Sequence, residues 1–356
     1  MTDGVVNLQI IKKTDSKKQN LLVKIFNKRE VGILIPLILV FVITAIINPI
    51  FADVQNLMNI TFQASFVFIV AIAMTFVLIL GGLDLSVGSV MGLSGVISGL
   101  FILNLKDKLP VGLLIVIGII LGMLIGVLVG LINGYFIAKM KIPTLIVTLS
   151  TMYVARGMCE FLTRGNPVYP LPAEFNWLGQ GKFVFNSSGL AISTGGDIGL
   201  NVVTFIGIVL AVIAWFILTK TTFGRSVYAT GGNMETARLS GLKVTSVTMK
   251  VYILSSCAAA ISGILTAARL GSALSNSGTG YELNVIASVI IGGTSMFGGS
   301  GTILGTAIGA LLMTMVTNAM VMLKISPYLQ KVVIGSIILI AVGIDQYNRK
   351  RSGLLT

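Results

Sequence analysis

The chain has 356 residues, of which 55% are hydrophobic and only 10% are charged, and its mean hydropathy is +0.97. A chain of this composition has too little polar surface to cover a water-soluble globule, which excludes a soluble fold. It contains no histidine, and Cys159 and Cys257 lie in separate apolar segments, so no metal site, haem or disulfide framework is indicated. We therefore expect an all-α polytopic membrane protein.

The start of the chain is polar and basic. Residues 1–30 carry seven lysine or arginine residues against three acidic ones, which predicts a leader on the cytoplasmic side. Residues 31–50 then supply about twenty apolar residues, enough to cross a hydrocarbon core of roughly 30 Å. No small-residue cleavage site follows, which favours a first spanning helix over a removed signal peptide.

Further apolar segments predict spans at about 58–80, 88–104, 111–138, 143–163, 199–219, 248–268, 283–297, 301–323 and 329–347. With the first, these make about ten transmembrane helices, some of them short or broken by glycine. If the N-terminus is cytoplasmic, 17 of the 25 basic residues lie on that side, as the positive-inside rule requires. Both termini are then cytoplasmic, with a transmembrane domain at 31–347 and a tail at 348–356.

One stretch interrupts the apolar run from Ile60 to Leu103. It reads Gly81-Gly82-Leu83-Asp84-Leu85-Ser86-Val87-Gly88-Ser89, and Asp84 is the only charge in the run. A carboxylate at membrane depth is costly unless it is paired, hydrated or hydrogen-bonded, so it is a candidate functional group. The alternative role is to cap the helix that follows, and the two roles are compatible.

A second glycine-rich stretch, 292–301, follows an apolar piece too short to cross the bilayer. Both stretches contain Gly-Gly, five residues and then Gly-Ser: Gly81-Gly82 with Gly88-Ser89, and Gly292-Gly293 with Gly299-Ser300. Interrupted segments in corresponding parts of two halves point to a translocation path. The candidate path residues are Asp84, Ser86, Gly88, Ser89, Gly292, Gly293, Thr294 and Ser295.

Glycine also recurs at every fourth residue in two spans, which allows helix backbones to approach closely in lipid. These candidate packing residues are Gly118, Gly122, Gly126, Gly130 and Gly134, and then Gly301, Gly305 and Gly309. A four-residue step overshoots one helical turn by about 40°. The longer ridge should therefore wind round its helix and serve more than one neighbour.

Two connecting regions stand out from the spans. The region 164–200 is rich in proline and polar residues, and we expect either an external cap or a plain connecting loop. The region 220–250 is the longest cytoplasmic loop. Within it, Asn233 is a good N-cap, Glu235 suits a first turn and Gly241 is a natural stop. The predicted helix of about seven residues would be marginal alone in water, so a partner should pack on it.

At these residues the chain resembles the permease subunits of ribose-type ABC sugar importers, and the resemblance extends along nearly the whole chain. The matching stretches are Gly81 to Ser89, Ala229-Thr230-Gly231-Gly232-Asn233 through Ser240-Gly241, and Gly280-Tyr281-Glu282-Leu283 with Gly292-Gly293-Thr294-Ser295. The resemblance implies a multi-pass protein of the bacterial cytoplasmic membrane that pairs with a second copy of itself. It further implies two cytosolic ATP-binding subunits and an extracytoplasmic binding protein that delivers a monosaccharide such as ribose, xylose or galactose.

The same resemblance identifies the short helix in the 220–250 loop as the coupling helix to the ATP-binding subunit. Its implied contact residues are Asn233, Glu235, Ala237, Arg238 and Gly241. Thr236 stands where a second alanine is common in the family, so the pattern is matched only in part.

The chain itself lacks the Gly-x4-Gly-Lys-Ser/Thr phosphate loop, so we expect no cofactor in this chain and ATP bound by a partner. It is expected to be a transport subunit and not an enzyme, since the spans offer neither paired carboxylates nor a nucleophile with a base. Two alternatives remain open. The permease could carry another solute class, such as nucleosides or branched-chain amino acids, or Asp84 could carry a proton in a secondary transporter.

Overall fold

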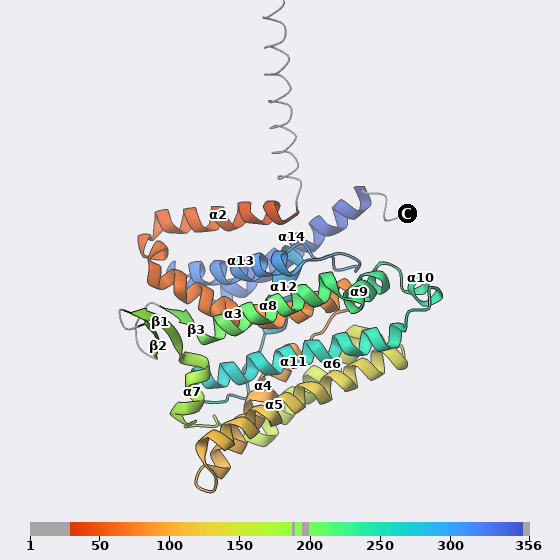
Figure 1. Cartoon of the computed structure of the whole chain (residues 1–356). Coiled ribbons are helices and arrows are strands. Elements are labelled where there is room, and N and C mark those ends of the chain that lie inside the picture. The colour runs from red at the N-terminus through yellow and green to blue at the C-terminus, as the bar shows by residue number, and fades with distance from the viewer. Residues whose placement is uncertain (1–28, 187–188, 194–198, 352–356) are drawn as a thin grey trace, which may run out of the picture.

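The computed structural model describes residues 29–186, 189–193 and 199–351, and it is built mainly from helices packed side by side (Figure 1). The long helices are α2 (Arg29–Ile47), α3 (Val54–Ile79), α4 (Val87–Leu105), α5 (Val111–Gly134), α6 (Thr144–Thr163), α8 (Val202–Lys220), α11 (Val244–Leu270), α13 (Ile303–Met322) and α14 (Pro327–Arg351). The short ones are η1 (Pro49–Ala52), the π-helical η2 (Tyr135–Lys139), α7 (Ala173–Gln180), α9 (Thr222–Gly232), α10 (Met234–Leu239) and α12 (Tyr281–Ile291).

Eight helices of the described chain are long and apolar enough to cross a membrane, which confirms the all-α polytopic class. Two further expected spans coincide with shorter apolar helices, Gly32–Ile47 within α2, and α12. The expected span at 283–297 is wrong at its end, because Gly292 and Gly293 stop α12 at Ile291. At the other end of the chain, α14 continues to Arg351, beyond the expected start of the tail at 348. Of the expected leader, 1–28 lies outside the described residues.

The bundle has two different ends (Figure 1). At one end, α7 lies beside a small antiparallel sheet of order β2-β1-β3, made of β1 (Lys182–Asn186), β2 (Gly189–Ser193) and β3 (Leu200–Asn201). The region 164–200 thus contains folded elements and is not a plain loop. The opposite end carries α9 and α10. We call these the sheet end and the α10 end.

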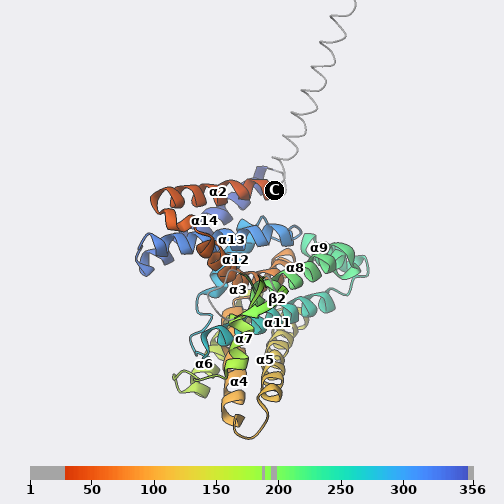
Figure 2. The same ribbon diagram turned by 60° about the vertical axis from the view of Figure 1, so that its left-hand side comes forward.

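Helix α11 lies at the centre, packed on α3, α4 and α5. Both views place α2, α13 and α14 on one side of the bundle and α4 and α5 on the other (Figure 2). The fully buried Tyr252 of α11 belongs to the largest apolar core, together with residues of α3, α4 and α12.

The glycine ridge of α5 faces two neighbours in turn. Gly118 lies against Ile102 of α4, and Gly122 touches both α4 and α11. The last three glycines, Gly126, Gly130 and Gly134, lie against the backbone of α11. At Gly126 a Cβ atom would stand 2.8 Å from the carbonyl oxygen of Ser256. The backbones of α5 and α11 can approach this closely because the ridge carries no side chains.

Replacing Gly126 by leucine should therefore force α5 and α11 apart and lower the unfolding temperature of the detergent-extracted protein by several degrees. The matched control is Gly157→Leu in α6, where nothing lies within 4 Å of the position a Cβ would take. Thermal unfolding of both variants gives the comparison. Equal unfolding temperatures for Gly126→Leu and the parent would contradict the packing role.

Candidate functional site

The first glycine-rich stretch is a break between α3 and α4. Gly81 adopts a left-handed conformation with φ of +82° and donates its N–H to Leu78 O, while Gly82 N–H donates to Val77 O. These bonds satisfy the last carbonyls of α3 and end the helix. The chain then crosses the protein interior until α4 begins at Val87.

Asp84 lies in this break and is fully buried. Its Oδ1 accepts hydrogen bonds from the backbone N–H of Ser86 at 3.0 Å and from the Ser86 hydroxyl at 2.6 Å, and its Oδ2 accepts from the Ser255 hydroxyl at 2.7 Å. Asn133 of α5 donates to Ser86 Oγ at 3.0 Å. The carboxylate therefore joins the break to α11, and through Ser86 to α5.

Asp84 also lies at the start of α4, where a capping role was predicted. It accepts from the backbone N–H of Ser86, the N-cap residue, and from no N–H of the first turn of α4. The role that the geometry shows is to hold the broken segment in place.

Removing this carboxylate should leave the Ser86 and Ser255 hydroxyls without their acceptor. We expect Asp84→Ala to lower the stability of the assembled protein by about 2–3 kcal/mol, and uptake to be lost with it. Asp84→Asn keeps an acceptor oxygen and should have a smaller effect. Thermal unfolding and solute uptake of both variants give the measurement. Normal uptake and stability for Asp84→Ala would show that the network is dispensable.

The second break follows α12 and ends that helix in the same way. Gly293 has a φ of +83° and donates to Ile290 O, and Thr294 N–H donates to Val289 O. This pair of bonds matches the pair made by Gly81 and Gly82. Gly81 therefore corresponds to Gly293, whereas the sequence repeat had aligned Gly81 with Gly292. The Gly-Ser halves do not correspond, since Gly88-Ser89 lies inside α4 and Gly299-Ser300 lies before α13.

The two breaks meet each other and helix α9. Gly299 N–H donates to the carbonyl oxygen of Ile79 at 2.8 Å, which joins the second break to the end of α3. Gly231 of α9 lies against the same carbonyl oxygen and against Gly299 N, with no room for a Cβ atom. Tyr228, also on α9, donates its hydroxyl to Gly301 O at 2.7 Å. We call Ile79, Gly231 and Gly299 the break junction.

Sequence reasoning did not single out Gly231 or Tyr228 as functional residues. The only signal was the Gly231-Gly232 pair inside the family-like loop. Nothing in the local pattern shows that this pair meets the end of α3.

The candidate path residues lie in or beside the breaks, and in this structure seven of the eight are buried in protein. Gly88 lies against the carbonyl of Gly278 and the side chain of Glu282. On α13, Gly305 lies against the carbonyl of Gly292 and Gly309 against that of Ser288. Gly301 lies before α13, against the Thr294 side chain. That these residues line a path stays a prediction.

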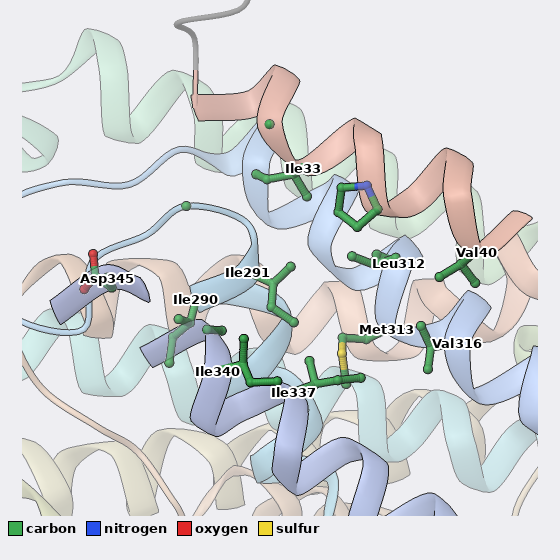
Figure 3. A pocket seen from close by; sticks show the side chains of 14 residues that line it. Ile33, Val40, Ile290, Ile291, Leu312, Met313, Val316, Ile337, Ile340 and Asp345 are labelled. Carbon is green, nitrogen blue, oxygen red and sulfur yellow. The ribbon is translucent and has the colours of Figure 1, made fainter. Parts of the chain in front are cut away.

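Gly293 is the half-exposed member of that set, and it faces a cavity of about 620 Å³ (Figure 3). The cavity lies between α2, α12, α13 and α14 and is lined mainly by aliphatic side chains. Its one carboxylate, Asp345, accepts a hydrogen bond from Ser295 Oγ at 3.2 Å. An aliphatic lining offers few partners to the hydroxyl groups of a polar solute.

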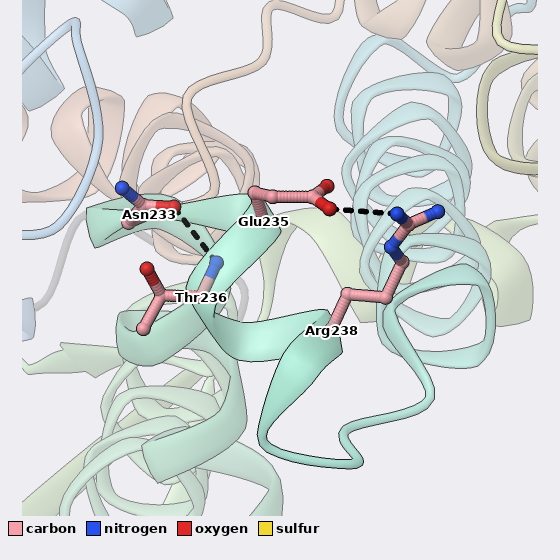
Figure 4. A network of polar contacts seen from close by, with 4 residues as sticks. All are labelled: Asn233, Glu235, Thr236 and Arg238. Atoms are coloured by element: carbon pink, nitrogen blue, oxygen red, sulfur yellow. Dashed lines mark hydrogen bonds and ion pairs between the residues drawn. The ribbon is translucent and has the colours of Figure 1, made fainter.

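Helix α10 forms the tip of the α10 end. Asn233 ends α9 and begins α10, and its Oδ1 accepts from Thr236 N–H at 2.9 Å (Figure 4). Glu235 and Arg238 form an exposed ion pair at 2.6 Å. Gly241 follows with a φ of +82°, as expected for a helix stop.

The side chains of α10 divide between the protein and the outside. Ala237 is 4% exposed and faces the rest of the chain, whereas Met234 is 55% and Leu239 is 79% exposed. Two large apolar side chains on a helix of six residues at the tip of the molecule indicate a surface that a partner covers. The implied coupling residues are therefore gathered on one accessible element, with Ala237 on its inner side.

A bundle of membrane-length helices defines a multi-pass membrane protein, and its two buried glycine breaks point to a transporter. Over residues 56–342 the chain matches the family described as the permease component of branched-chain amino acid transport systems, and it belongs to that family. No solved structure matches.

Several relatives are sugar import permeases. The chain is 38% identical to the ribose import permease of Haemophilus influenzae over 88% of this chain and 92% of that protein. It is 39% identical to the ribose import permease of Bacillus subtilis over 91% and 94%. It is 38% identical to the L-arabinose transport system permease of Escherichia coli over 90% and 92%. The expected ribose-type ABC permease family is thereby confirmed, and the chain is a multi-pass protein of the bacterial inner membrane.

Proposed function

We propose that this chain is the membrane-spanning subunit of an ATP-driven importer and that two copies form the translocation path for a monosaccharide. The observation that carries the proposal is the connection between α10 and the two breaks. Asn233 joins α10 directly to α9, and Gly231 of α9 meets both the second break, at Gly299, and the end of α3, where the first break begins. A partner that moves α10 would therefore act on both broken segments at once.

The partner at α10 is a cytosolic ATP-binding subunit, one for each copy of the chain. The exposed Met234 and Leu239 supply an apolar contact, and the chain has no phosphate loop of its own. In this arrangement the α10 end is cytoplasmic. The sheet end then faces outward, where an extracytoplasmic binding protein delivers the solute.

The cargo is a neutral sugar in this proposal because named relatives import ribose and L-arabinose. Another relative, the autoinducer 2 import permease of Shigella flexneri, is 32% identical over 90% of the chain. The family description names branched-chain amino acids. The experiment must therefore offer all of these solutes.

The test uses vesicles that contain either the chain alone or the chain with its ATP-binding subunit, with loaded binding protein supplied outside. We expect uptake of a monosaccharide only with the complete set and ATP. Accumulation by the chain alone in response to a proton gradient would overturn the proposal and support the secondary transporter. Uptake of amino acids without sugars would keep the ATP-driven mechanism and change the cargo.

A further inference from the structure

The cavity of about 620 Å³ beside Gly293 lies among apolar helices of the bundle and is itself apolar almost throughout. Of the residues that line it, only Asp345 carries a polar side chain. The chain does not enclose the cavity, and Ile340 on its wall is 61% exposed. At the depth of membrane-spanning helices the surroundings are hydrocarbon and not water, so acyl chains have access to it.

The single carboxylate lies at one end of this cavity. Figure 3 places Asp345 at that end and Val40 and Val316 at the other. Helix α14 continues past Asp345 to the basic residues 349–351, and basic residues are typical of the end of a span at the membrane surface. Asp345 therefore lies near the lipid headgroups, and the apolar lining leads from it into the bilayer.

The length of the lining corresponds to one leaflet of the bilayer. Along α14 it extends from Ile337 to Asp345, which is about 12 Å of helix. One half of a hydrocarbon core of roughly 30 Å is about 15 Å. The cavity thus offers an apolar surface to most of one acyl chain, whereas a transmembrane helix of a partner would need a groove along the whole thickness.

The partners of Asp345 define the headgroup. Its Oδ2 accepts from the Ser295 hydroxyl at 3.2 Å, and no lysine or arginine nitrogen of the described side chains lies within 4.0 Å of the carboxylate. A primary ammonium group would supply both the missing positive charge and N–H donors. A phosphoglycerol headgroup would bring only a negative charge, which the carboxylate repels.

Helix α14 itself lacks neighbours that a lipid would provide. It packs mainly on α12, and its described residues from 327 to 343 are all half-buried or exposed. A chain in the cavity would fill the space between α14 and the facing helices α2 and α13. It would also touch the second break, because Gly293 lines the cavity and Ser295 of the same break holds Asp345.

We propose that this cavity binds one acyl chain of phosphatidylethanolamine, a phospholipid with a primary ammonium headgroup, and that the ammonium pairs with Asp345. The bound lipid holds α14 against the bundle and supports the second break from the side. This lipid site goes beyond the proposed import function and does not depend on it.

The test measures thermal unfolding of the delipidated full-length chain in detergent. Three lipids with the same acyl chains are added in turn, with ethanolamine, choline or glycerol headgroups. We expect phosphatidylethanolamine to raise the unfolding temperature by several degrees. Phosphatidylcholine, whose cation has no N–H donor, should raise it less, and phosphatidylglycerol least. Asp345→Asn keeps an acceptor for Ser295 but removes the charge, so it should give equal rises with all three lipids.

A second pair of variants tests the apolar part of the cavity. Ala341→Leu places a larger side chain in the cavity and should abolish the lipid-induced rise for every headgroup. The matched control is Gly343→Leu on the same helix, which does not line the cavity, has nothing within 4 Å of its Cβ position and should keep the rise.

Equal rises with the three lipids in the parent chain would overturn the inference. The same conclusion follows if Asp345→Asn discriminates between the headgroups as the parent does, or if Ala341→Leu keeps the full rise. Size-exclusion chromatography of Ala341→Leu gives a further check, because loss of a dimer in this variant alone would show that a second copy of the chain fills the cavity instead of a lipid. Should Ala341→Leu fail to fold, the parent and Asp345→Asn decide the question, since the asparagine keeps the shape of the side chain.

Discussion

Replacing Gly231 by alanine is expected to abolish solute uptake, whereas the same change at the adjacent Gly232 should leave uptake at the parental level. A Cβ atom at Gly231 would overlap the carbonyl oxygen of Ile79 and stand 3.0 Å from Gly299 N. These are backbone atoms, so they cannot swing aside as a flexible side chain would. At Gly232 nothing lies within 4 Å of the corresponding position.

The physical reason for so large an effect is that three chain segments meet at the break junction. The Ile79 carbonyl ends α3 and accepts the hydrogen bond from Gly299 of the second break. An added methyl group must push α9 away from that bond or break it. Either change alters the link between α10 and both breaks, while the two alanines have the same effect on helix propensity.

The measurements are uptake, ATP hydrolysis stimulated by loaded binding protein, and the amount of assembled complex. Tyr228→Phe is a second variant, which removes the hydrogen bond to Gly301 O without adding volume and should reduce uptake several-fold. Equal transport by Gly231→Ala and Gly232→Ala would show that the junction does not link α10 to the breaks. Loss of assembled complex in Gly231→Ala alone would show that the contact is needed for folding, and the result for Tyr228→Phe would then decide the coupling role.

Local chemistry made several features predictable from the sequence. Asn233 and Gly241 bound α10 because an N-cap side chain and a left-handed stop act within a few residues of themselves. The same holds for Gly81 and Gly293, which end α3 and α12 by local backbone bonds. The membrane class could be predicted because it follows from the amino-acid composition, which does not depend on how the chain folds.

Features that depend on the packing of distant segments could not be predicted from the sequence. Asp84 was expected near a helix start, but its acceptor role toward Ser255 needs α11 to pass the break, which no pattern around Asp84 indicates. Arg269 of α11 and Asn284 of α12 come from different helices, and only the tertiary packing brings them to the lining of one cavity. The strands β1 and β2 were also missed, because the prolines and polar residues earlier in the region 164–200 favour a loop.

The exposed ion pair of α10 gives a way to separate docking from folding. Glu235 and Arg238 stand three residues apart, and each side chain is 63% exposed. Such a surface pair contributes only about 0.3–0.5 kcal/mol, and the double reversal Glu235→Arg with Arg238→Glu keeps a pair of opposite charges at the same spacing. The reversed charges oppose the helix dipole by only a few tenths of a kcal/mol. The fold and the unfolding temperature should therefore stay unchanged.

If α10 docks on the ATP-binding subunit as proposed, function should respond very differently, because each reversed charge would then face a like charge on the partner. We expect the double reversal to stop uptake and to make ATP hydrolysis unresponsive to loaded binding protein. The matched control is Glu235→Gln with Arg238→Gln, which removes both charges without reversing them and should weaken coupling less, because like charges are not brought together. Parental uptake by the double reversal would show that these charges take no part in docking, and the exposed Leu239 would then be the contact to test. A fall in unfolding temperature would instead mean that the pair supports α10 itself, contrary to the small energy that its exposure allows.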